Sequence, residues 1–192
     1  MTATMTSNTT TKTPRPGRSP LRIERAGRED MSTIAGIISS SAEWYRDIVD
    51  EADMNEHEVG AAWAEANFGL REFYLGYVGD TPIGTISLQY FGDHAYLGYI
   101  YLDVEHVGEG FGGRLMKHAE QVARDRDMAG LALIAHPEAT WAQRAYLKYG
   151  FEIVEHERTG VLAWQDGALE PHYEEGFQLY TYSFDDESQE IV

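Results

Sequence analysis

Hydrophobic residues recur along the chain with two spacings, one typical of helices and one typical of strands. Segments of the two kinds succeed one another and predict a mixed α/β fold. A helix with apolar residues three or four apart begins near Asp30, and the turn Gly79-Asp80 joins two strands tightly enough for an antiparallel hairpin. Further helices are expected over residues 115–122 and 141–149. Strands are expected at residues 21–26, 73–78, 83–90, 95–102, 131–135, 151–155 and 178–184.

A second helical region is expected between the first helix and the hairpin. Ser40 and Glu43 have the spacing of a capping box, and apolar residues continue on one helical face as far as Ala52. Another helical pattern runs from Val59 to Ala66. We expect two short helices that cover one end of the sheet.

Length and composition favour one domain behind a tail. The chain has 192 residues, of which 43% are hydrophobic, and this suits a single core over residues 21–192. Residues 1–20 contain no acidic side chain, little that is apolar, and many Thr and Pro, so we expect a disordered tail. The pattern of a signal peptide or of a membrane-spanning run is missing, and a cytoplasmic protein without a membrane partner is expected.

Charge and cysteine usage narrow the chemistry further. The chain has no cysteine, so an acyl-cysteine intermediate is excluded. The formal net charge of −17 has the wrong sign for a nucleic-acid partner. A carboxylate-rich surface with only three lysines is typical of halophilic proteins, and a site that attracts cations is the alternative interpretation.

The most informative stretch is a glycine-rich turn between a strand and a helix, over residues 100–115. Four glycines within residues 108–113 let the backbone approach an anion closely. A helix that starts at such a turn presents unpaired N–H groups and the positive end of its dipole to a diphosphate. A simple flexible turn is the structural alternative.

Other ligand and enzyme classes fit the sequence less well. Gly108, Gly110 and Gly113 satisfy the dinucleotide-binding pattern, but the turn follows an antiparallel hairpin, and the next strand ends at His136 instead of an acid for the ribose. The P-loop and serine-hydrolase motifs are absent from the sequence. The seven histidines lack the spacing of a metal site, so no metal is expected.

With this turn the chain resembles the GCN5-related N-acetyltransferases. The segment Val107-Gly108-Glu109-Gly110-Phe111-Gly112 is similar to the glycine loop of the family, and residues 142–151 resemble its A-x-x-x-Y-x-x-x-G-F segment. The resemblance spans roughly residues 21–184. It implies a mostly antiparallel sheet of six or seven strands, flanked by helices and splayed open where acetyl-CoA binds.

The resemblance also implies a reaction and a set of site residues. The acetyl group would pass directly from acetyl-CoA to an amine on a small molecule or a peptide, with Tyr146 as the acid that protonates the CoA thiolate. Glu43 and Asp47, four residues apart on one helix face, lie where the family builds its acceptor site. The residues expected to bind the cofactor are Leu102, Val107, Gly108, Gly110, Phe111, Gly112 and Gly113.

Several residues depart from the family pattern and keep a second function open. Val107 replaces a basic or amide residue, Ala139 stands where Asn is common, and Glu105 and Glu109 should repel a phosphate. Arg114, Lys117, Arg144 and Lys148 are the candidates for compensating positive charge. The alternative is a non-catalytic acyl-CoA-binding or interaction domain on the same fold.

A long aromatic and acidic excursion over residues 164–177 precedes the last strand. Excursions of this length are often functional. Two roles are equally compatible with the sequence: a wall of the acceptor pocket, or a contact with a second subunit in a homodimer.

Overall fold

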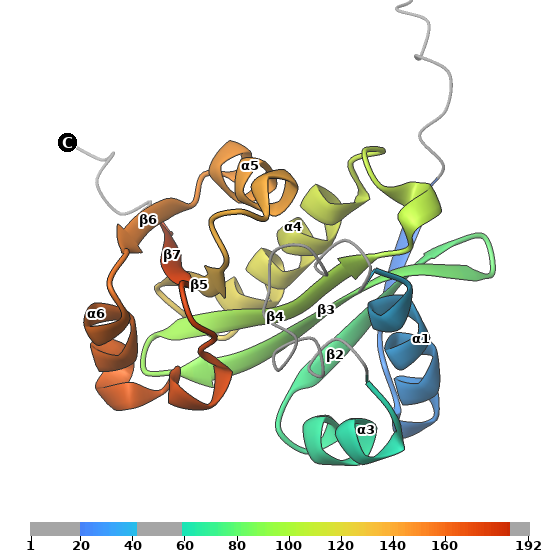
Figure 1. The fold of residues 1–192 in the computed structure, drawn as a ribbon. Helices are drawn as coiled ribbons and strands as arrows, with labels where there is room; N and C mark the ends of the chain where they lie inside the picture. The colour runs from blue at the N-terminus through green and yellow to red at the C-terminus, as the bar shows by residue number, and fades with distance from the viewer. Residues whose placement is uncertain (1–19, 42–58, 185–192) are drawn as a thin grey trace, which may run out of the picture.

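A computed structural model describes residues 20–41 and 59–184 of the chain. Their strands form one seven-stranded sheet in the order β1-β2-β3-β4-β5-β7-β6, in which only β4 and β5 run parallel to each other (Figure 1). The strands are β1 Leu21–Arg25, β2 Glu72–Val78, β3 Thr81–Phe91, β4 His94–Leu102, β5 Gly130–Ala135, β6 Glu152–Glu155 and β7 Gln178–Ser183. The mostly antiparallel, mixed sheet predicted from the sequence is confirmed.

Helices cover both faces of this sheet (Figure 1). The α-helices are α1 Met31–Ser41, α3 Ala61–Phe68, α4 Phe111–Arg124, α5 Thr140–Tyr149 and α6 Arg158–Ala163. The short 3₁₀ helices are η1 Arg28–Asp30, η3 Val104–His106, η4 Trp164–Gly167 and η5 Glu170–His172. The excursion before the last strand is therefore built largely from short helices.

Three apolar clusters hold the layers together. The largest lies between the sheet and α4, where Leu115, Ala119 and Ala123 are completely buried at helical spacing. On the opposite face, α1 and α3 pack over β2, and Ile34 and Ile38 are completely buried there. A smaller cluster on that same side lies under α6 and the 3₁₀ helices. The apolar spacing that predicts these two helices therefore marks their buried faces.

One predicted helix start is wrong. Ser40 was expected to cap a new helix, but it lies in the last turn of α1 and its hydroxyl donates a hydrogen bond to the carbonyl of Ile37 at 2.8 Å. Serine inside a helix commonly bonds back to the preceding turn in this way. The rest of the predicted helix, with Glu43 and Asp47, lies outside the described residues, as does nearly all of the expected N-terminal tail.

The parallel pair β4 and β5 opens the sheet at its centre. Only His94–Tyr96 pair with Gly130–Ala132, although β4 continues to Leu102 and β5 to Ala135. The two strands separate beyond this point, and the splayed sheet expected from the sequence is present. The opening positions the candidate site.

Candidate functional site

The glycine turn ends β4 and starts α4. Asp103 accepts a hydrogen bond from the N–H of Glu105 at 3.0 Å and so begins the one-turn helix η3. Gly108 and Gly110 follow with φ angles of +88° and +85°, which favour glycine. Gly110 has no capping side chain and stands directly before Phe111, the first residue of α4. The N–H groups of the first turn of α4 therefore lack a side-chain cap, and a helix start of this kind is suited to an anion.

A groove of about 600 Å³ runs from this turn along the end of β4 to α5. Its wall contains Leu102, Val107, Gly108, Gly110, Gly112 and Gly113, which are six of the seven residues predicted to bind the cofactor. Phe111 is not among the lining residues, because its side chain is buried against His106, with ring centres 6.0 Å apart. Any contribution of Phe111 to the groove must come from its backbone.

The charges around the groove differ from those expected. Glu105 and Glu109 do not line it, and the Glu109 carboxylate lies 3.7 Å from the His106 ring nitrogen. Of the four predicted cations, Arg114 and Lys148 line the groove, whereas Lys117 pairs with the buried Glu120 at 2.9 Å. The two carboxylates of the turn are therefore not part of the groove wall.

A β-bulge interrupts β4 beside the groove. Thr85 pairs with Tyr101 and Ser87 with Gly98, so Tyr99 and Ile100 both lie opposite Ile86. Tyr99 has φ +47°, a backbone conformation that is rare for a residue other than glycine. A bulge leaves one residue out of the hydrogen-bonded ladder, and such irregularities are common next to active sites.

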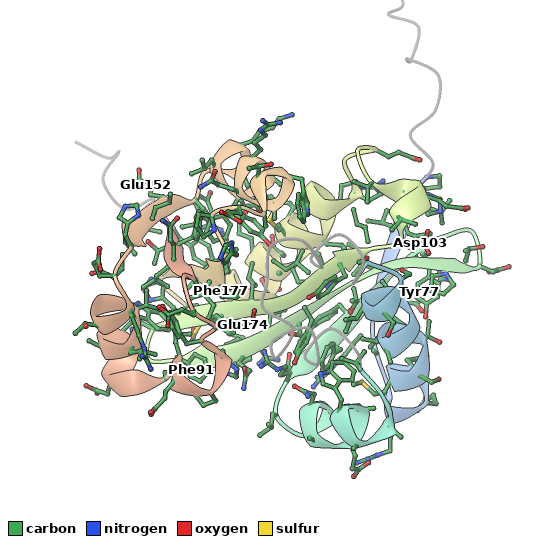
Figure 2. The ribbon with its side chains drawn as sticks, in the orientation of Figure 1. Tyr77, Phe91, Asp103, Glu152, Glu174 and Phe177 are labelled. Atoms are coloured by element: carbon green, nitrogen blue, oxygen red, sulfur yellow. The ribbon has the colours of Figure 1, made fainter. Side chains whose placement is uncertain are left out.

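The opening between β4 and β5 forms a second, smaller pocket of about 120 Å³, which we call the inner pocket. Aromatic rings make up much of its wall, and Figure 2 shows Glu174 and Phe177 of the excursion close to β4 and β5. Its charged and aromatic residues are Arg71, Tyr96, Tyr99, Tyr101, His136, Tyr146, His172, Glu174 and Phe177. Two roles were possible for the excursion, a pocket wall or a subunit contact. Its residues Glu174 and Phe177 line this pocket, which agrees with the first role.

Tyr146 belongs to both the groove and the inner pocket, together with Ile100, Tyr101 and Ala142. The ring of Tyr146 also packs against Phe151 and Tyr180, with centres 6.1 and 5.9 Å away. This packing holds the ring at the junction of the two cavities. A group at this junction can reach a ligand in either of them.

The sequence patterns do not identify Arg71, His172 and Glu174, three polar residues of the inner pocket, as site residues. Arg71 precedes β2, and His172 and Glu174 belong to the excursion, whose involvement was expected but whose residues were not named. Burial and the positive charge of Arg71 lower the pKa of His172 to about 4. Of the residues that the structure describes, Glu174 alone brings a carboxylate to the wall of the inner pocket.

The lowered pKa of His172 predicts an acid-sensitive fold. An unfolded histidine has a pKa of about 6.5, so between that pH and about 4 the unfolded state binds one proton more than the folded state. The free energy of unfolding should therefore fall as the pH falls through this window. Urea unfolding at a series of pH values should show a shallower acid loss in His172→Phe than in the wild type. Equal slopes would contradict the prediction.

Two further findings concern metals and membranes. Across residues 20–41 and 59–184, no three His, Asp or Glu side chains gather as they would around a metal ion. The helices in this part of the chain are also too short or too polar to cross a membrane.

The fold and the two cavities together define a class: an α/β protein with a long groove that ends at a glycine turn and a helix N-terminus and that opens into a compact pocket. The sequence profile of the Acetyltransferase (GNAT) family matches residues 36–151. This match covers more than half of the chain, and the chain belongs to that family. The dinucleotide-binding alternative is not supported, since it requires a doubly wound parallel sheet.

One curated relative and several solved structures are similar to this chain. Holothin acyltransferase from Pseudoalteromonas sp. (strain SANK 73390) is 34% identical over 117 residues, which are 59% of this chain and 37% of the relative. The chain thus spans well under half the length of that relative.

The solved structures share the fold at low sequence identity. PaiA N-acetyltransferase from Thermoplasma acidophilum, solved with coenzyme A, has a TM-score of 0.70 at 18% identity, over 86% of this chain and 99% of that one. A GNAT acetyltransferase from Staphylococcus aureus Mu50 has a TM-score of 0.65 at 18% identity, over 86% and 100% of the two chains. These likenesses support the fold.

Proposed function

We propose that this protein transfers an acetyl group from acetyl-CoA to a primary amine. The observation that carries the proposal is the position of Tyr146, where a groove headed by an anion site meets a compact pocket. The groove fits a long substrate with a diphosphate, because the turn of Gly108 and Gly110 presents backbone N–H groups and Arg114 and Lys148 add positive charge. The acyltransferase relative and the neighbour solved with coenzyme A support this substrate.

The residues of the site suggest how each proton moves. The protonated acceptor amine first loses a proton to Glu174, directly or through a water, and the neutral nitrogen then forms a bond to the acetyl carbon. The nitrogen releases its second proton to solvent as the adduct collapses to the amide. The bulge at Tyr99 and Ile100 offers backbone N–H donors to the oxyanion that develops. As the carbon–sulfur bond breaks, Tyr146 donates its phenolic proton to the thiolate. A phenol is suited to this role, because the reference pKa of tyrosine, about 10, lies above neutral pH.

Titration calorimetry with acetyl-CoA, CoA and NAD, at low and at molar KCl, tests the binding step. Saturable binding of acetyl-CoA and CoA but not of NAD is expected. The net charge of −17 should repel the phosphates at low salt, and in molar salt the screening length falls to about 3 Å, so binding should persist there. Binding only to NAD, or no binding at either salt, would overturn the assignment of the groove.

Thiol release across a panel of amines tests the transfer step. The chain contains no cysteine, so every thiol that a chromogenic reagent detects comes from CoA. Turnover with at least one amine is expected. Binding of acetyl-CoA without turnover on any amine would instead favour the non-catalytic acyl-CoA-binding domain.

Replacing Glu174 by glutamine should lower kcat/KM for the amine roughly 100-fold, within the range known for general bases. The substitution keeps the size of the side chain and removes its basicity. The affinity for acetyl-CoA should change less than threefold, because Glu174 does not line the groove. The neighbouring Glu175→Gln is the matched control, since Glu175 is exposed and lies outside both cavities. An equal loss in both variants would contradict the role of Glu174.

A further inference from the structure

Arg71 joins three separate segments at the wall of the inner pocket. Its Nε donates to the side-chain oxygen of Asn67 on α3 at 3.0 Å, and its Nη2 lies 3.0 Å from Nδ1 of His172 on η5. The guanidinium also stacks over the ring of Tyr99 in the bulge of β4, 4.8 Å from the ring centre. A Cβ atom at Gly98 would lie 2.6 Å from Nη1 of Arg71, so the guanidinium occupies the space that a side chain there would fill.

The contact with Arg71 determines which nitrogen of His172 carries the proton. A guanidinium only donates hydrogen bonds, so Nδ1 of His172 must accept. In the neutral ring the proton is then on Nε2. The imidazole is held parallel to Tyr96, with ring centres 5.3 Å apart and planes inclined by 13°. Among the described residues, no group accepts a hydrogen bond from Nε2 of His172.

The surroundings of His172 keep its ring neutral. Arg71 approaches it from the start of β2, Tyr96 from β4 and Phe91 from β3, and Glu174 lines the same pocket. Burial and the charge of Arg71 both disfavour protonation. Since its lone pair already accepts a bond from Arg71, His172 is unsuited to take a proton from the acceptor amine.

We propose that Arg71 and His172 form a clamp that fixes His172 as a hydrogen-bond donor in the inner pocket, and that the pocket thereby selects a small planar amine carrying a hydrogen-bond acceptor next to the amino group. The acceptor class rests on the proposed function. Planarity follows from the aromatic walls of a pocket of about 120 Å³, formed by rings such as Tyr96, Tyr99 and Phe177. The acceptor atom follows from the Nε2–H group, which would otherwise be buried against the bound substrate without a partner.

Nitrogen-15 NMR of the wild-type protein tests the clamp without any turnover. The expected spectrum shows His172 with Nδ1 unprotonated and Nε2 protonated, and with no titration between pH 5 and 8. In Arg71→Gln the pKa of His172 should rise toward its ordinary value, because the positive charge beside the ring is removed. A His172 that carries its proton on Nδ1, or that titrates near pH 6.5 in the wild type, would overturn the clamp.

A matched set of amines tests the acceptor class. Benzylamine, 2-(aminomethyl)pyridine and 4-(aminomethyl)pyridine have the same shape, and only the second has an acceptor beside the amine. We expect its kcat/KM to exceed that of the other two by at least tenfold, since one unmet buried donor costs about 1–3 kcal/mol. In His172→Phe, which keeps a ring against Tyr96, this ratio should fall to about one while the affinity for acetyl-CoA stays within threefold.

The control for the clamp is Arg158→Gln. Arg158 also stacks on a tyrosine, Tyr173, at 5.8 Å, but it lines neither cavity, so the preference among the amines should be unchanged. Equal rates for the three amines in the wild type would overturn the acceptor class. Absence of turnover on every amine would overturn the proposed function together with that class, whereas the NMR result decides the clamp by itself.

Discussion

Replacing Gly113 by leucine is expected to lower the affinity for acetyl-CoA by about 100-fold or more while the protein stays folded. Gly113 lies in the first turn of α4 and lines the groove, and a Cβ atom built there meets nothing within 4 Å. A leucine side chain would therefore fill the space above the N–H groups at the start of the helix. Loss of two charge-assisted hydrogen bonds, at about 1.5–3 kcal/mol each, accounts for this factor.

The same substitution should not harm the helix. Gly113 has no positive φ, and leucine is a better helix former than glycine by up to about 1 kcal/mol. Gly110 is a less selective test, because its φ of +85° would add backbone strain to the steric block. Calorimetry measures the affinity, and thermal unfolding measures the stability.

Gly36→Leu is the matched control for this experiment. Gly36 also lies in a helix, α1, and a Cβ atom there also meets nothing within 4 Å, but it lines neither cavity. This variant should bind acetyl-CoA as the wild type does. Unchanged affinity in Gly113→Leu would mean that the diphosphate does not lie on this turn.

The sequence predicted those parts of the fold and the site that depend on local chemistry. The hairpin of β2 and β3 needs only the turn at Gly79, which has φ +60°, and two apolar strands beside it. The glycine turn between the end of β4 at Leu102 and the first turn of α4 is likewise local. Such features are encoded within about ten residues, and the pattern of one sequence is sufficient to find them.

The inner pocket depends on contacts that local patterns do not encode. In a regular strand Tyr96 and Tyr99 would point to opposite faces of the sheet, because side chains alternate. The bulge after Gly98 shifts this alternation by one residue, so Tyr96, Tyr99 and Tyr101 all line the inner pocket. Gly98 was a visible signal, since a glycine within a strand often marks a bulge or a close backbone approach.

The pair of Arg71 and His172 illustrates the same limit. These residues are 101 positions apart, and neither belongs to a motif. They meet because the sheet order places β7 beside β5, which brings the excursion before β7 over the first residues of β4. The acidic pair Glu43 and Asp47, which the sequence favoured for the acceptor site, lies outside the described residues and stays a prediction.

Replacing Tyr146 by phenylalanine is expected to lower kcat by roughly 10²- to 10⁴-fold, the range typical of a general acid. The ring would keep its contacts with Phe151 and Tyr180, so the walls of both cavities should be preserved. Only the phenolic proton is lost. The thiolate would then leave without a proton donor, and the affinity for acetyl-CoA should change less than threefold.

The dependence of the rate on the acidity of the leaving thiol separates this role from a packing role. The more acidic a thiol is, the more readily it leaves as an unprotonated thiolate. An acyl donor with a more acidic thiol should therefore need Tyr146 less. The loss caused by Tyr146→Phe should therefore be smaller with an acetyl thioester of an aromatic thiol than with acetyl-CoA, when both are measured by single-turnover kinetics. A merely structural tyrosine would slow both donors equally.

Tyr180→Phe controls for the loss of a hydroxyl beside the site. Tyr180 packs against Tyr146, but it lines neither cavity, and its hydroxyl accepts a hydrogen bond from Gln143 at 3.3 Å. Its removal should lower stability slightly and leave kcat within about threefold. If Tyr180→Phe and Tyr146→Phe lose activity to the same extent, the loss reflects packing around α5, and the proton must reach the thiolate from another group or from water.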